Sequence, residues 1–255
     1  MIYLLLSGVS AYLGITVGLG ASTLLRPLLD AVTTLSPSSV AMLCTMATLV
    51  AALVSAFFAL SRPLPLDQDE LLFLAAGGVL GGILGDLLSA RFIAVLSPSG
   101  VILLQNALLF VLIALPAVYF GTLCRTVRPL GLTRMASLPV ALIIGLLASF
   151  LSFGAEPVTI AAYYLLFDAD DDEAAIAALT VALTAMAGKL LTLLIRQRFF
   201  LPDADTLLWL LPGALVGAVA ALLLSLRTRR LTLSDMLLKM SLFTSLINMA
   251  ASLAG

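Results

Sequence analysis

The sequence predicts an all-α integral membrane protein whose chain crosses the bilayer many times. Of its 255 residues, 62% are hydrophobic and only 11% are charged, whereas an ordinary soluble domain has about 25% charged residues. The mean hydropathy is +1.19. Such a chain has no room for a soluble catalytic domain, and its net charge of −1 gives no reason to expect nucleic-acid binding.

Several stretches are apolar over the length that one spanning helix needs, about 20 residues. They run near 39–61, 69–90, 99–120, 174–195, 206–226 and 232–253. Two further stretches, 2–35 and 137–167, are too long for one simple span. Each is either one span with a re-entrant piece or two short helices that meet within the membrane. The total is therefore about eight to ten membrane segments.

Each long stretch carries a charged residue followed by proline, Arg26-Pro27 in the first and Glu156-Pro157 in the second. Both dipeptides follow small residues, and they are 156 − 26 = 130 residues apart. A proline biases the preceding residue away from the helix, so we expect a break near each, with a kinked continuous helix as the alternative. Charged, interrupted segments at matching places in two halves are the best sequence pointer to a transporter's substrate site.

Internal repetition divides the chain into two related halves. A set of small residues with four-residue spacing recurs 136 positions later. The members are Gly77, Gly81 and Gly85 in the first half, and Gly213, Gly217 and Ala221 in the second. This spacing lets helices pack closely, so these faces serve either internal packing or a homodimer.

We expect an N-terminal membrane repeat over 1–120, a basic connector over 121–136 and a C-terminal membrane repeat over 137–255. The connector carries Arg125, Arg128 and Arg134, and the positive-inside rule places it in the cytoplasm. The remaining arginines slightly favour an odd number of segments in each half. Odd-numbered halves would be inverted repeats.

The opening segment 14–29, followed by 35–41 and a threonine-containing helix, resembles the TauE/SafE family of sulfite exporter-like permeases. Its echo over 145–166, followed by 175–184, carries the same resemblance. The layout is similar to that family's over nearly the full length. The resemblance implies a permease of small anions, often sulfur-containing. Arg26 and Glu156 do not belong to a family signature and stand on their own chemistry.

Three ionisable side chains within apolar stretches are candidate substrate-binding groups. Arg26 presents a planar fork that pairs with oxyanions, although it would serve equally as an interfacial arginine or as an ion pair with Glu156. Glu156 is a proton carrier, a counter-ion or a helix-end residue in a chain without histidine. Lys189 lies mid-span and either joins the anion path or pairs with an acid. Asp86 and Arg91 are expected to form an interfacial pair.

Small residues beside the breaks complete the predicted substrate site. Their hydroxyls donate to an anion or, more often, to backbone carbonyls freed by the break. Broken helices also expose N–H groups that attract anions. The predicted members are Gly20, Ser22, Thr23, Ser152 and Gly154 at the breaks, with Thr48 and Thr184, which match across the halves.

The leading functional interpretation is a secondary transporter of small, sulfur-containing anions such as sulfite or organosulfonates, embedded in the inner or plasma membrane. It would work by alternating access around the two broken segments, without a cofactor or metal. Proton or ion coupling and a homodimer stay open. The alternatives are a non-transporting subunit or assembly factor and, less favoured, a membrane-embedded enzyme. The last lacks histidine and any HExxH or Gly-x-Ser-x-Gly motif.

Overall fold

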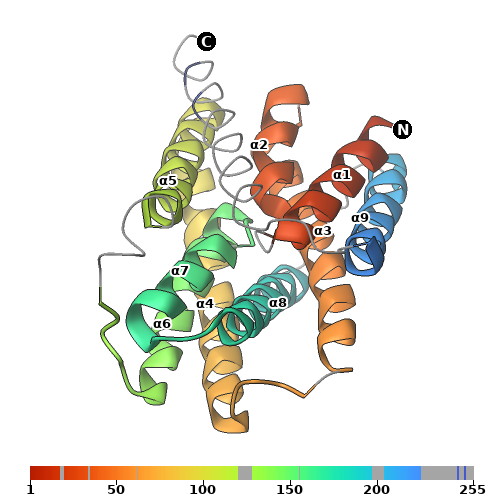
Figure 1. Cartoon of the computed structure of the whole chain (residues 1–255). Coiled ribbons are helices and arrows are strands. Elements are labelled where there is room, and N and C mark those ends of the chain that lie inside the picture. Colours follow the sequence, from red (N-terminus) through yellow and green to blue (C-terminus); the bar gives the residue numbers. More distant parts are fainter. Residues whose placement is uncertain are drawn as a thin grey trace.

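A computed structural model describes residues 1–17, 20–33, 35–61, 63–119, 128–154, 156–196 and 204–224, together with Leu246 and Ala250. Every regular element within this part of the chain is helical, which confirms the all-α prediction (Figure 1). In chain order the elements are α1 (Ile2–Val17), α2 (Ser22–Val32), α3 (Pro37–Ala59), α4 (Gln68–Val95), α5 (Pro98–Val118), the 3₁₀ turn η2 (Arg134–Ala136), α6 (Ser137–Leu151), α7 (Glu156–Phe167), α8 (Asp171–Ile195) and α9 (Ala204–Leu224).

Six described helical stretches are long and apolar enough to cross a membrane. The predicted spans near 39–61, 69–90, 99–120, 174–195 and 206–226 coincide with α3, α4, α5, α8 and α9. The sixth spanning stretch, Arg134–Leu151, contains α6. The span predicted near 232–253 lies outside the described residues, apart from Leu246 and Ala250.

Each of the two long apolar stretches forms two helices that fold back on each other (Figure 1). Helices α1 and α2 form the first hairpin, and α6 and α7 form the second. Gly20 precedes α2 with a φ of +76°, and Ser152 ends α6 with a φ of 52°. These left-handed conformations reverse the chain, and glycine adopts them without the Cβ penalty that serine carries.

The first break lies upstream of the predicted position. Arg26 and Pro27 are inside α2, whereas Glu156 is the first residue of α7. Ser22 and Glu156 are the first residues of α2 and α7, and they are 156 − 22 = 134 residues apart. Glu156 therefore corresponds to Ser22 and not to Arg26. The effect of a proline on the preceding residue is a bias that a helix can overcome, while the left-handed Gly20 provides the turn itself.

The two hairpins open toward opposite ends of α4. The second hairpin lies with its open end at the start of α4, where Tyr163 of α7 donates a hydrogen bond of 3.1 Å to Glu70 Oε1. Arg134, which precedes α6, forms an ion pair there with Asp67. The first hairpin leads into the start of α3, where Ser38 lines a cavity with Asp86 and Ile93 near the other end of α4.

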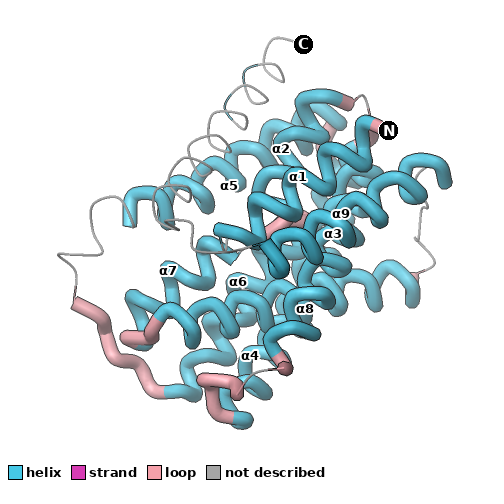
Figure 2. The backbone as a smooth tube through the Cα atoms, turned by 45° about the vertical axis from the view of Figure 1, so that its right-hand side comes forward, coloured by secondary structure: helices cyan, strands magenta, loops and turns pink. Residues whose placement is uncertain are grey.

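Helices pack mainly across the two halves. Helix α4 contacts α6 and α8, and α9 contacts α1 and α3 (Figures 1 and 2). With α1 matched to α6, α3 to α8 and α4 to α9, these two sets of contacts correspond to each other. One long helix of each half, α4 or α9, therefore packs mainly against helices of the other half. The predicted boundaries at the connector 121–136 stay a prediction, because 121–127 lies outside the described residues.

The repeated glycines make these contacts possible. A Cβ at Gly77 would lie 2.5 Å from Leu138 O, and one at Gly81 would collide with Leu142 O. In the second set of glycines, a Cβ at Gly213 of α9 would collide with Leu4 O of α1, and one at Gly217 would collide with Gly8 O. Because the partners advance together, α4 runs parallel to α6 and α9 runs parallel to α1. The glycine faces therefore serve internal packing.

Replacing Gly81 with alanine is expected to destabilise the α4–α6 contact. The new methyl group meets backbone, which cannot move aside like a flexible side chain, so we expect a cost of about 1–3 kcal/mol. Thermal unfolding of the purified protein in detergent measures the effect. Gly100→Ala is the matched control, because its methyl group would meet the side chain of Ser97 at 3.2 Å. Equal melting temperatures for the two variants would contradict the packing role.

Candidate transport site

The tips of the two hairpins meet in the interior of the protein. Ser22 Oγ, in the first turn of α2, accepts a hydrogen bond of 2.6 Å from Gly154 N, which lies just before α7. The Glu156 carboxylate occupies the space that a Cβ at Gly20 or at Gly154 would fill. These four predicted site residues therefore form one cluster. Its two glycines are required by the close approach of the carboxylate.

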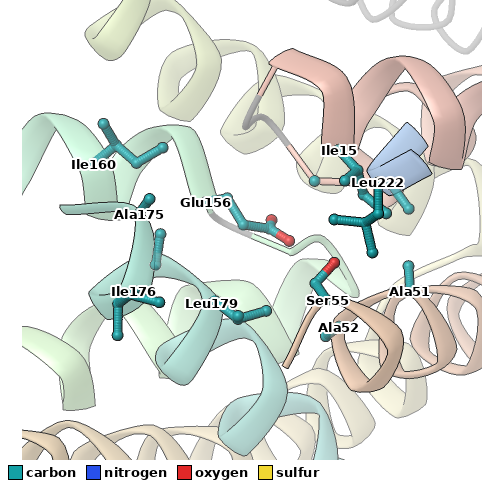
Figure 3. Close-up of a pocket in the computed structure, with 13 residues that line it drawn as sticks. Ile15, Ala51, Ala52, Ser55, Glu156, Ile160, Ala175, Ile176, Leu179 and Leu222 are labelled. Carbon is teal, nitrogen blue, oxygen red and sulfur yellow. The ribbon is translucent and has the colours of Figure 1, made fainter. Parts of the chain in front are cut away.

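A cavity of about 190 Å³ opens beside this cluster, between α1, α3, α7, α8 and α9. Figure 3 shows the side chains of Glu156 and Ser55 directed into it from α7 and α3. The other described lining side chains are apolar. Glu156 Oε2 is buried and has no hydrogen-bond partner. We call this space the Glu156 cavity.

The Glu156 cavity adjoins a larger vestibule of about 330 Å³. The vestibule extends to Asp172 at the start of α8, and the two spaces share Ile15, Ser55, Ala175, Ile176 and Leu222. The vestibule also reaches Ala59, the last residue of α3. The Glu156 cavity therefore faces the end of the protein at which α3 ends and α8 begins.

A second cavity, of about 160 Å³, lies between α3, α4 and α8. Lys189 lines it and is only 3% exposed. The lysine Nζ donates hydrogen bonds of 2.6 Å to Ser149 O and 2.5 Å to Ser152 Oγ, so it caps the C-terminal end of α6. We call this space the Lys189 cavity. The hydrogen bond from Lys189 to Ser152 brings together two predicted site residues.

Asp86 also lines the Lys189 cavity, together with Ser89. The predicted helix end near residue 90 is too early, because α4 continues to Val95; Asp86 is 6% exposed within it, while Arg91 is exposed. The sequence contained the missing signal. Apolar residues resume directly after Arg91, which argues for a longer helix than 69–90. The predicted interfacial pair of Asp86 and Arg91 stays a prediction.

Arg26 lies in a different polar cluster, between α2 and α5. It is 2% exposed, donates from Nη2 to Gln105 Oε1 at 2.5 Å, and has Nε 3.9 Å from Asp30 Oδ2. Its Nη1 is buried and has no hydrogen-bond partner. Arg26 is therefore neither a snorkelling arginine nor the ion-pair partner of Glu156. It is also absent from the described lining of both cavities.

Two of the three predicted threonines donate hydrogen bonds within their own helices, and the third is buried. Thr48 donates to Cys44 O at 2.8 Å, and Thr184 donates to Thr180 O at 2.7 Å. Thr23 is fully buried in the first turn of α2. The matched pair Thr48 and Thr184 thus makes the same intrahelical bond in both halves, which is the structural role rather than the ligand role.

The two cavities occupy corresponding positions in the two halves. The Lys189 cavity is lined by α3, α4 and α8, and their matching helices α8, α9 and α3 are among those that line the Glu156 cavity. The Lys189 cavity reaches Ser38, near the start of α3. The two cavities therefore face opposite ends of α3, with the paired hairpin tips close to both.

Comparison with known proteins gives one strong match. The family described as "Sulfite exporter TauE/SafE" matches residues 3–251, which is nearly the whole chain. No curated protein and no solved structure matches it. The family is one of membrane transporters, and the described helices include six that can span a membrane. The chain therefore belongs to the sulfite exporter TauE/SafE family.

Proposed function

We propose that this protein is a secondary transporter that moves small, sulfur-containing anions such as sulfite or organosulfonates by alternating access. Membership of the family supports the anion class. The observation that carries the mechanism is the pair of corresponding cavities that face opposite ends of α3. A carrier needs such alternative openings around one barrier, and here the barrier is the contact between the hairpin tips.

The correspondence between the halves supports inverted repeats. The hairpins open toward opposite ends of α4, and the helices α3, α4 and α8 that line the Lys189 cavity have their matching helices α8, α9 and α3 in the lining of the Glu156 cavity. If the halves exchange conformations, one cavity closes as the other opens. The single hydrogen bond between Ser22 and Gly154 is a small barrier to such a movement of the tips.

The Lys189 cavity is the proposed anion site. A buried ammonium group attracts an anion strongly, and the hydroxyl groups of Ser38 and Ser89 add donors. Asp86 in the same cavity supplies a counter-charge while no anion is bound. The cavity, of about 160 Å³, has room for a small anion such as sulfite or a small sulfonate.

Arg26 is assigned a positioning role in this proposal. Its hydrogen bond to Gln105 fixes α2 against α5 and keeps the first hairpin in place, while Asp30 on α2 balances its charge. The anion site is therefore proposed at Lys189, which lines a cavity, and not at Arg26, which the sequence also made a candidate. The Ser152 hydroxyl joins the lysine to the tip of the second hairpin, so a ligand at Lys189 can act directly on the barrier.

Removing the charge of Lys189 is expected to abolish transport. In proteoliposomes preloaded with unlabelled sulfite or methanesulfonate, the native protein should accumulate the labelled anion by counterflow. We expect Lys189→Met to reduce the initial rate at least about tenfold, because the buried site loses its only described cation. Arg91→Met, which removes an exposed charge near the same cavity, is the control. Unchanged counterflow in a folded Lys189→Met protein would refute the assigned site.

Accessibility of the two cavities should differ by side. Single cysteines are introduced by Ser55→Cys and Ser89→Cys in a protein that carries Cys44→Ala and Cys124→Ala. If the connector is cytoplasmic, an impermeant thiol reagent should label Ser55→Cys from the cytoplasm and Ser89→Cys from the opposite side. Added substrate should change the two labelling rates in opposite directions. Labelling of both positions from one side only would contradict alternating access.

A further inference from the structure

Glu156 is an acidic side chain without a charged partner in the interior of the membrane protein. Its carboxylate lies between Gly20 and Gly154, and its Oε2 is buried without a hydrogen-bond partner. An ionised carboxylate in such surroundings carries a large desolvation cost that no nearby cation offsets. Ionisable groups at this depth are rare and generally functional. The arrangement therefore indicates that the Glu156 carboxylate itself binds a ligand.

The surrounding elements supply no cation among the described residues. The lining from α1, α3, α8 and α9 is apolar apart from Ser55. Asp172, at the mouth of the vestibule, is acidic and exposed. Lys189 is bound at the end of α6, and Arg26 is bound to Asp30 and Gln105. Every charged group on the facing helices is therefore either acidic or already engaged elsewhere.

A metal ion does not suit this position. The described residues contain no group of three or more histidine, cysteine or acidic side chains that could hold one. A hard cation takes about six oxygen ligands, whereas Glu156 and Ser55 are the only described polar side chains in the cavity. A proton needs just one carboxylate oxygen and a path to water. The vestibule that shares Ser55 and ends at Asp172 supplies this path.

The balance of charge ties this carboxylate to the transported anion. Lys189 and Asp86 cancel each other while the Lys189 cavity is empty, so a bound monoanion leaves the interior with one net negative charge. A proton on Glu156 prevents a second negative charge beside the hairpin tips. If Glu156 were instead protonated only when no anion is bound, the anion-bound protein would carry two negative charges, one on the anion and one on Glu156.

We propose that Glu156 is the proton-binding site of this protein, distinct from the Lys189 anion site, and that one proton travels in the same direction as each anion. This inference rests on the proposed transport function and adds its coupling ion. Glu156 is the first residue of α7 and touches both hairpin tips. Loss of its proton places a charge between Gly20 and Gly154 and so favours separation of the tips and opening of the vestibule.

The test uses methanesulfonate, which stays a monoanion across the pH range, in proteoliposomes with and without a pH gradient. The native protein should accumulate labelled methanesulfonate when the outside is acidic, and should also support counterflow at equal pH. Glu156→Gln should retain counterflow within about twofold but lose accumulation driven by the pH gradient. Asp205→Asn, which removes an exposed acid in the first turn of α9 that lines neither cavity nor the vestibule, should keep both activities.

The outcomes separate this inference from the proposed function. No counterflow by the native protein for any sulfur oxyanion would refute transport itself. Counterflow together with full pH-driven accumulation in Glu156→Gln would refute only the proton site. Accumulation driven by a sodium gradient and lost in Glu156→Gln would replace the proton with sodium.

A second readout does not depend on transport. The infrared spectrum of the purified native protein at neutral pH should contain a protonated-carboxyl band that disappears in Glu156→Gln and persists in Glu70→Gln. Glu70 is the matched control, because it is also a buried carboxylate but accepts a hydrogen bond from Tyr163. An unchanged band in a folded Glu156→Gln protein would overturn the assignment.

Discussion

The structure depends on how the backbone is satisfied where two helices are interrupted inside an apolar protein. A lipid bilayer offers no hydrogen bonds, so each interruption must find its partners within the chain. The amide of Gly154 uses Ser22 Oγ from the other half, and Gly20 N donates to Gly14 O at 3.2 Å. At the end of α6, Lys189 Nζ donates a hydrogen bond to the Ser149 carbonyl oxygen. The hairpin tips are thus held by each other and by one buried lysine.

The glycine faces allow this arrangement because they set the distance between long helices. Gly81 brings α4 onto α6, and Gly217 brings α9 onto α1, so each hairpin is braced by a helix of the opposite half. Helices α3 and α8 contact each other, and they also contact the two hairpins, α3 through α1 and α2 and α8 through α6 and α7. Two cavities lie beside these contacts, one next to Glu156 and one next to Lys189.

The chemistry of the two halves differs although their architecture corresponds. Lys189 and Asp86 line one cavity, whereas Glu156 and Ser55 are the described polar side chains that line the other. One cavity therefore carries a pair of opposite charges, and the other is apolar except for Ser55 and a lone acid that starts α7. In the mechanism proposed above, this difference separates the anion-binding site from the proton-binding site without a second domain.

The sequence by itself determined the helical membrane fold, most of the spans, the small-residue faces and the family resemblance, because hydropathy and residue spacing are local properties. It also identified Gly20, Ser22, Gly154 and Glu156, which the structure brings together. Only the tertiary structure decided which charges meet. Arg26 turns toward Gln105, and Asp86 shares a cavity with Lys189, since these neighbours come from helices that are distant in the chain and their approach depends on how α4 and α5 pack. The position of the first break was likewise decided by the left-handed turn at Gly20 rather than by the local preference at Pro27.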